Sequence, residues 1–299
     1  MSYITTIDLG SNSFRVLQYS CSTNQIINQY ETVVGTANGL TKTKKISNEA
    51  LNNIIKAINH TKKLFNFDPS KTIAVTTQAM RVALNSQEII NTILKKTDVK
   101  FNIIDGDEEA RLTLLAMQYA LKRENIKSEK FILIDIGGGS TEIVIYTKDK
   151  TYSKSFELGI ITLTQSKNKK QSFENFINNV SSFLNDSKLN ISNFDFVSTA
   201  GTPTTIAALK NNLNYKTYDS YIVNGTVVTL EDCKYYKNIL LNSSKDEAIN
   251  LVGSGRIEYL ESGINIFESL YKIFNKSSSI VFDDGLREGV AIDWCINHN

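Results

Sequence analysis

Two short runs of small residues, each preceded by an aspartate, are the part of the sequence best suited to bind phosphate. The first is Gly10–Ser13 after Asp8, and the second is Gly137–Thr141 after Asp135. Small side chains let successive backbone N–H groups approach an anion closely. An aspartate beside a phosphate needs a cation or a water between the two negative groups. We therefore expect phosphate binding by Gly10, Ser11, Asn12, Ser13, Gly137, Gly138, Gly139, Ser140 and Thr141. The alternative is that both runs are only tight hairpin turns.

Two other polar segments add hydroxyl groups and a guanidinium. They are Thr76–Arg81 and Gly201–Thr205, each after an apolar run, and Arg81, Gly201 and Thr202 are their candidate phosphate-binding residues. An arginine can hold a phosphate through a planar bidentate fork. Neither a Walker A sequence nor a complete dinucleotide fingerprint occurs in the chain.

A third cluster, Gly106–Arg111, supplies acids at the expected start of a helix. Acids there are favoured by the helix dipole, and Glu108 can pair with Arg111 one turn later. Glu109 could instead deprotonate a water aimed at phosphorus if it faces a ligand site. A fourth acid, Glu142, takes the place that Arg15 has after the first turn, so the two turns are expected to have different roles.

The elements that would position these residues occur twice. Each half begins with a β-rich run, an aspartate, a small-residue turn and a second β-rich run, which predicts a β-hairpin. A helix follows, with apolar residues at helical spacing in 51–58 and again in 173–184. Each half then has a strand, at 73–75 and 194–197, a small-polar loop and another helix. This alternation predicts an α/β protein with two related lobes of mixed β-sheet flanked by helices.

The length of 299 residues also favours two domains. We place the boundary in the polar stretch 121–129. The expected lobes are therefore 1–123 and 124–299, with the C-terminal helix able to pack back on the first lobe. Two lobes joined so closely are expected to enclose a ligand cleft.

Composition excludes several functions. The formal net charge is +2, so a polyanion must be held by a local site, and we expect no nucleic-acid partner. Three distant cysteines exclude a disulfide framework and a thiolate zinc cluster, and two histidines make a histidine-based centre improbable. No apolar run could span a bilayer and no basic segment precedes Asp8, so we expect neither membrane nor signal peptide, and a cytoplasmic location.

Five ordered motifs resemble those of the exopolyphosphatase / guanosine-pentaphosphate phosphohydrolase (Ppx/GppA) family, and together they cover nearly the whole chain. They are the opening run Ile7–Arg15, the A-T-Q-A-x-R-like Thr76–Arg81, the G-x-E-E-A-R-L-like Gly106–Leu112, the D-I-G-G-G-S-T-E motif Asp135–Glu142 and the G-L-R-E-G motif Gly285–Gly289. The resemblance implies the actin, Hsp70 and sugar-kinase architecture, a ribonuclease H-like duplication around a central cleft.

The resemblance also implies a metal-dependent hydrolase. It would release the terminal phosphate of inorganic polyphosphate or of guanosine pentaphosphate (pppGpp), a nucleotide of the stringent response, and would form a homodimer. Carried over, Glu109 is the catalytic base, Asp135 and Glu142 associate with Mg²⁺ (or Mn²⁺), and the glycine-rich turns and Arg81 hold phosphate. Asp8 is assigned to the metal as the matching acid of the first turn.

Three alternatives stay open at this point. One is an ATP-dependent small-molecule kinase of the same superfamily, another an actin-like scaffold without enzymatic activity, and the third an inactive regulator. The sequence also departs from the family at Pro203, where many members have a small residue. Proline lacks an N–H and so removes one donor from a possible phosphate-binding loop.

Overall fold

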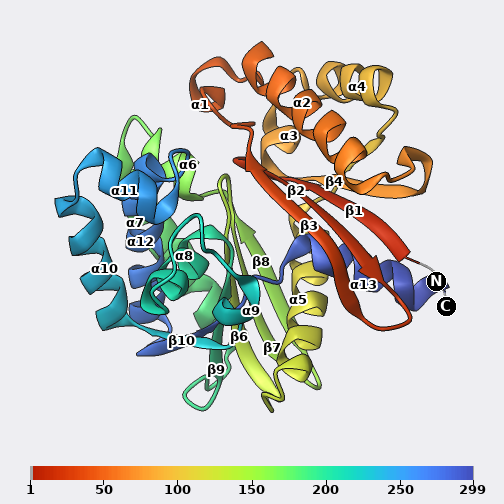
Figure 1. Cartoon of the computed structure of the whole chain (residues 1–299). Coiled ribbons are helices and arrows are strands. Elements are labelled where there is room, and N and C mark those ends of the chain that lie inside the picture. The colour runs from red at the N-terminus through yellow and green to blue at the C-terminus, as the bar shows by residue number, and fades with distance from the viewer. Residues whose placement is uncertain (1–2, 299) are drawn as a thin grey trace. The chain divides into compact units, whose positions relative to one another are not determined.

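The computed structural model describes residues 3–298 and divides into two compact units (Figure 1). Unit 1 comprises Met1–Ala116 and Leu286–Asn299, and unit 2 comprises Met117–Gly285. The division falls inside helix α5 (Gly106–Arg123), ahead of the boundary expected at 123, and helix α13 (Leu286–His298) belongs to unit 1. Within residues 3–298, no helix is both long and apolar enough to cross a membrane.

Unit 1 is built on a five-stranded sheet of order β3-β2-β1-β4-β5. Its strands are β1 (Tyr3–Leu9), β2 (Ser13–Ser20), β3 (Gln25–Val33), β4 (Thr72–Thr76) and β5 (Phe101–Ile103). Its other helices are α1 (Leu40–Thr43), α2 (Asn48–Phe65), the 3-10 turn η1 (Pro69–Lys71), α3 (Gln78–Val82) and α4 (Ser86–Thr97). Strands β1, β2 and β3 are antiparallel neighbours, whereas β1, β4 and β5 run parallel.

Unit 2 has a six-stranded sheet of order β10-β11-β9-β6-β7-β8. Its strands are β6 (Lys130–Ile136), β7 (Thr141–Thr147), β8 (Thr151–Phe156), β9 (Asp195–Thr199), β10 (Thr226–Thr229) and β11 (Ser278–Val281). Its helices are α6 (Ile160–Thr164), α7 (Lys169–Ser187), α8 (Gly201–Lys210), α9 (Ser220–Val223), α10 (Leu230–Asn242), α11 (Lys245–Val252) and α12 (Ile257–Ile273). Helices α6, α7, α8, α10 and α12 gather on one side of this sheet (Figure 1), where they bury the main apolar core.

The duplication expected from the sequence is confirmed by the strand orders. Strands β8-β7-β6-β9-β11 of unit 2 correspond in order to strands β3-β2-β1-β4-β5 of unit 1. Unit 2 has one additional strand, β10, at the edge beside β11. The two predicted hairpins are β1–β2 and β6–β7, and the two predicted amphipathic helices are α2 and α7. The third strand of each unit, β3 and β8, did not feature in the prediction because both strands are largely exposed and polar.

The two segments expected as small-polar loops are mostly helical, which corrects that expectation: α3 begins at Gln78 and α8 at Gly201. Arg81 lies in α3, and Gly201 and Thr202 are the first residues of α8. Pro203 is tolerated in α8 because the first four N–H groups of a helix have no intrahelical partner. Small polar residues are thus compatible with a first helical turn as well as with a loop.

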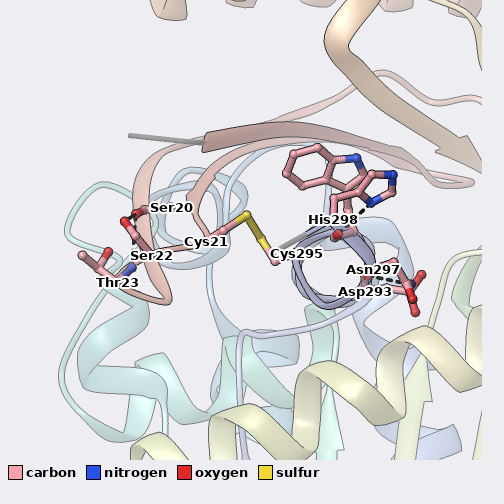
Figure 2. Close-up of a disulfide and its surroundings, with 9 residues drawn as sticks. Ser20, Cys21, Ser22, Thr23, Asp293, Cys295, Asn297 and His298 are labelled. Carbon is pink, nitrogen blue, oxygen red and sulfur yellow. Dashed lines mark hydrogen bonds between the residues drawn. A yellow bond between two sulfur atoms is a disulfide. The ribbon is translucent and has the colours of Figure 1, made fainter.

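A disulfide bond joins Cys21, just after β2, to Cys295 in α13 (Figure 2). Their Cα atoms are 5.3 Å apart although 274 residues separate them in sequence. Only one bond forms, and the third cysteine, Cys233, is free and buried. From sequence, a disulfide framework is excluded, and a single bond was not foreseen because it depends on α13, which returns to unit 1 and packs on β1 and β2.

The C-terminal G-L-R-E-G motif has a packing role in unit 1. The side chains of Arg287 and Glu288 form a buried ion pair of 2.6 Å, and the Arg287 carbonyl accepts a hydrogen bond from the Thr6 hydroxyl of β1. A Cβ atom at Gly289 would collide with the Leu112 carbonyl of α5. Glycine at this position thus lets α13 pack closely on α5.

Candidate active site

Within each unit, the candidate residues follow the carboxyl ends of parallel strands, the edge where α/β proteins bind ligands. In unit 1, β1 is followed by the turn 10–13, β4 by α3 with Arg81, and β5 by α5 with Glu109. In unit 2, β6 is followed by the turn 137–140 and β9 by the start of α8.

In unit 2, the carbonyl groups of the glycine-rich turn are held by the start of α6. The amides of Ile160 and Ile161 donate to the carbonyls of Gly137 and Gly138 at 3.0 and 2.8 Å, and the Thr162 hydroxyl donates to the Gly139 carbonyl at 3.3 Å. The described peptide bonds are trans, so each amide hydrogen points away from the carbonyl of its own peptide group. The amides of residues 138, 139 and 140 therefore point away from α6, as an anion-binding turn requires.

Gly159, which is not among the residues predicted from sequence, makes this arrangement possible. A Cβ atom there would lie 2.5 Å from the Gly137 carbonyl oxygen and 2.6 Å from the Gly138 carbonyl carbon and oxygen. Any side chain at residue 159 would push the turn away from α6. The residue lies far along the chain from the D-I-G-G-G-S-T-E motif, so no local spacing pointed to it.

The corresponding turn of unit 1 is held in a similar way. The Ser11 carbonyl accepts from the Ala37 amide at 2.8 Å, and the Asn12 carbonyl accepts from the amides of Val34 and Gly35 at 2.9 and 3.0 Å. The segment after the third strand of each unit thus fixes the carbonyls of the small-residue turn. The hydrogen-bonding pattern supports the expected equivalence of the two turns.

Arg81 and Glu109 meet in unit 1. Arg81 Nη1 lies 2.9 Å from Glu109 Oε2, and these side chains are only 16% and 11% exposed. Nη1 also donates to the Ile104 carbonyl at 2.8 Å, and Nε donates to Gln78 Oε1 at 2.9 Å. The arginine is therefore anchored to the protein on two edges, and its Nε is not available for the bidentate phosphate fork expected from sequence.

Glu108 differs from its neighbour Glu109, as predicted. It accepts two hydrogen bonds from Arg111, at 2.7 and 2.8 Å, and both side chains are well exposed. Arg111 also pairs with Asp293 of α13 at 2.9 Å. The hydrogen bond with Glu108, followed by that with Asp293, raises the pKa of the Arg111 guanidinium. Glu108 therefore forms an ion pair on the surface, while the Glu109 side chain is buried beside Arg81.

Asp135 and Glu142 are direct cross-strand partners in the β6–β7 hairpin. Their side chains lie on the same face of the sheet, because opposite residues of an antiparallel pair project together. This face is opposite to that of Ile134 and Ile136, which belong to the helical core. Glu142 is 2% exposed and accepts a hydrogen bond from Ser155 at 2.7 Å, whereas Asp135 is half-buried.

In unit 1, the residue opposite Asp8 is an arginine, whereas in unit 2 the residue opposite Asp135 is the acid Glu142. The cross-strand partner of Asp8 is Arg15, which in turn lies opposite Glu31 and is 3.4 Å from its carboxylate. The predicted charge difference between the two hairpins is thus placed at matching positions of the register. In unit 1 the aspartate lies beside a cation of the protein, and in unit 2 it lies beside another carboxylate.

The donor set of unit 2 fits a magnesium ion. Mg²⁺ is commonly held by one or two carboxylates, with waters and substrate phosphates completing its shell. Asp135 and Glu142 supply two carboxylates, and within residues 3–298 no group of three or more acids, histidines or cysteines is placed to hold a metal ion. In unit 1, Asn12 Oδ1 is a buried acceptor with no hydrogen-bond partner in the described chain, and a carboxamide oxygen is also a suitable ligand for a hard cation.

Several predicted hydroxyl groups are already engaged. Thr141 Oγ1 donates to the Leu158 carbonyl at 2.7 Å, and Thr205 Oγ1 donates to the Gly201 carbonyl at 2.6 Å. The Thr202 side chain is buried against α12, where a Cβ atom at Gly263 would collide with its hydroxyl. The hydroxyl groups of Thr141 and Thr205 are therefore occupied within the protein, and phosphate binding by Thr202 would rest on its backbone amide in the first turn of α8.

The fold and the candidate residues define a duplicated α/β protein with a small-residue turn after the first strand of each unit. The profile of the Ppx/GppA phosphatase family matches residues 18–298. Because this match spans nearly the whole chain, the chain belongs to the Ppx/GppA phosphatase family.

Individual relatives agree with this membership. The crystal structure of the Aquifex aeolicus Ppx/GppA family member is 27% identical, with a TM-score of 0.75, and the match covers 99% of this chain and 98% of that one. An exopolyphosphatase from Cytophaga hutchinsonii shares the fold, with a TM-score of 0.84 at 22% identity and coverage of 100% and 99%. A bifunctional 3-dehydroquinate synthase/phosphatase from Fusobacterium nucleatum is 23% identical, and the match covers 96% of this chain but 46% of that relative. The chain thus spans about half the length of this curated relative.

Proposed function

We propose that the protein is a phosphohydrolase that releases the terminal phosphate of inorganic polyphosphate, of guanosine pentaphosphate, or of both. The observation that carries the proposal is the buried Glu109 carboxylate, held by Arg81 where the parallel strands of unit 1 end. Membership of a phosphatase family supports a hydrolytic reaction. A homodimer and a cytoplasmic location remain predictions.

Glu109 is the proposed general base. A carboxylate can orient a water molecule and accept its proton as the water attacks phosphorus. The ion pair with Arg81 fixes the position of one carboxylate oxygen, so the side chain does not have to be ordered during the reaction. The neighbouring Glu108 is excluded from this role by its bidentate pairing with Arg111 on the surface.

The turns of both units are the proposed phosphate-binding elements. The amides of residues 138–140 point away from α6, and together they would contact the oxygens of a phosphate group. Arg81 would add a positive charge in unit 1. In unit 2, Asp135 and Glu142 would hold Mg²⁺ or Mn²⁺, which when bound neutralises phosphate charge and favours attack by water. In unit 1, Asp8 is a separate candidate metal ligand.

The proposal is tested by measuring phosphate release from long-chain polyphosphate, guanosine pentaphosphate and ATP, each with and without Mg²⁺. We expect release from at least one of the first two substrates without any co-substrate, and a loss of release when the metal is chelated. Consumption of ATP only in the presence of an alcohol or carboxylate acceptor would identify a kinase instead. The absence of turnover on all three substrates would contradict the proposal.

A further inference from the structure

The hydrogen bonds of Arg81 use only part of its guanidinium. Its five N–H groups comprise one on Nε and two on each terminal nitrogen. Gln78 takes the one on Nε, and Ile104 and Glu109 take the two on Nη1. Nη2 is buried and has no hydrogen-bond partner within residues 3–298. Three donors are therefore satisfied by the protein, and both hydrogens of Nη2 are left.

A buried donor without a partner costs free energy and needs an explanation. The direction of Nη2 is set by the other contacts, because the guanidinium is planar and rigid. Two acceptors on one terminal nitrogen fix one corner of this plane. The Gln78 acceptor on Nε fixes its rotation, and Nη2 is thereby held at one orientation.

Gln78 is well placed for this task. It is the first residue of α3, three positions before Arg81, so the two side chains lie on the same face of the helix. It is only 8% exposed, and its Oε1 lies 2.9 Å from Arg81 Nε. The contact is partly shielded from water, which makes it stronger than the same contact on the surface.

We propose that Gln78 is a positioning residue that orients Arg81 so that Nη2 donates to a phosphate oxygen of the substrate. The substrate phosphate is thus bound by Nη2 alone, while Nε continues to donate to Gln78. A phosphate oxygen at hydrogen-bond distance from Nη2 would satisfy this donor. The inference rests on the proposed phosphohydrolase function for the identity of the ligand.

A double-mutant cycle tests the inference. Gln78→Met removes the acceptor oxygen at nearly constant side-chain volume. Arg81→Lys removes the Nε–H group that donates to this oxygen. Binding of sodium tripolyphosphate in the presence of Mg²⁺ is measured by calorimetry for the unaltered protein, both single variants and the double variant. We expect Gln78→Met to weaken binding about tenfold, as for the loss of a hydrogen bond to a charged group. In the Arg81→Lys background the same change should weaken binding less than twofold.

The outcomes separate the inference from the proposed function. Equal losses in both backgrounds would show that Gln78 acts independently of Arg81 and would overturn the inference, even if phosphate release is normal. A failure of the unaltered protein to bind tripolyphosphate would overturn it as well. Strong coupling without turnover on any substrate would retain the inference and reject the hydrolase.

Two further measurements guard against a structural explanation. Circular dichroism and thermal unfolding check the fold, and Gln78→Asn, which is too short to reach Nε, replaces Gln78→Met if that variant does not fold. Where turnover is measurable, we expect KM to rise more than kcat falls, because Nη2 contacts the substrate in the ground state as well as the transition state. A fall in kcat alone would count against the inference.

Discussion

Arg81 Nη1 and Glu109 Oε2 are 2.9 Å apart, and the two residues come from different helices that follow neighbouring parallel strands. From sequence, the arginine is expected at phosphate and the glutamate at the attacking water, but no motif pairs the two residues. The pair places a proposed base and a proposed phosphate ligand in direct contact. A terminal phosphate held by Arg81 would thus lie close to the base that activates the water.

The first prediction concerns this base. Glu109→Gln keeps an oxygen that can accept from Arg81 but removes the ability to take a proton, so we expect phosphate release to fall by about 10²–10⁴-fold. Tripolyphosphate binding should stay the same or tighten, because one negative charge near a polyanion is lost. The measurement is steady-state phosphate release together with calorimetric binding.

Glu108→Gln is the matched control for Glu109→Gln. Glu108 pairs with Arg111 on the exposed face of α5, so its replacement should change turnover by less than about threefold, as for other exposed ion pairs. If Glu108→Gln is the damaging variant instead, the base is misassigned by one residue. Full activity in both variants would remove the carboxylate-base mechanism.

The second prediction concerns the metal. Asp135→Asn and Glu142→Gln each remove one carboxylate charge from the cross-strand pair but preserve shape. We expect the Mg²⁺ concentration for half-maximal phosphate release to rise and turnover to fall more than about tenfold. The exposed Glu157→Gln in the same unit is the control. Unchanged Mg²⁺ titrations in both variants would show that these acids do not hold the metal.

The repeat of two hairpins was predictable because each hairpin is local in sequence. The register even places Asp8 opposite Arg15 and Asp135 opposite Glu142, as the aligned repeats require. By contrast, Gly159 acts through a contact with a turn some 20 residues away in the chain, and nothing in its own neighbourhood indicates a close approach. Tertiary contacts of this kind carry no local pattern.

The helical state of the two small-polar segments was also hidden from sequence. Gln78–Arg81 consists of good helix formers but is too short to show helical periodicity, whereas Gly201–Thr205 consists of residues that favour turns and helix starts. Pro203 pointed to a loop, yet its position in the first turn of α8 requires no N–H. Composition alone could not separate these two cases, because the deciding factor is the packing of each short helix on its sheet.

The third prediction tests the support of the glycine-rich turn. Gly159→Ala would place a methyl group 2.5 Å from the Gly137 carbonyl oxygen, so the turn must move. We expect weaker tripolyphosphate binding and a loss of stability of about 1–3 kcal/mol, as for other overpacked sites. Gly285→Ala is the steric control, since its nearest contact, the Thr199 hydroxyl, is 3.7 Å away. Normal binding by Gly159→Ala would show that the position of this turn is not important for the anion.

The fourth prediction is a count of reactive thiols at pH 8. The folded, unreduced protein should have none, because Cys21 and Cys295 are bonded and Cys233 is buried. Burial, with Glu268 and Asp232 adding to it, raises the pKa of the Cys233 thiol to about 12, so little thiolate is present. Unfolding in guanidinium chloride should expose one thiol, and unfolding with a reductant should expose three. Three thiols without reductant would disprove the disulfide.

The last prediction concerns the stability that the disulfide gives to unit 1. This unit is made of two segments that are separated by the whole of unit 2, and the Cys21–Cys295 bond joins them covalently. Such a cross-link restricts the unfolded chain, and its removal typically costs 2–5 kcal/mol. We expect reduction to lower the thermal midpoint of the unaltered protein by several degrees, measured by circular dichroism with and without reductant. Cys21→Ser should have the lower midpoint in both conditions and should not respond to reductant, whereas Cys233→Ser should respond like the unaltered protein. Equal midpoints for the oxidised and reduced protein would mean that the packing of α13 on β1 and β2 is sufficient by itself to hold unit 1 together.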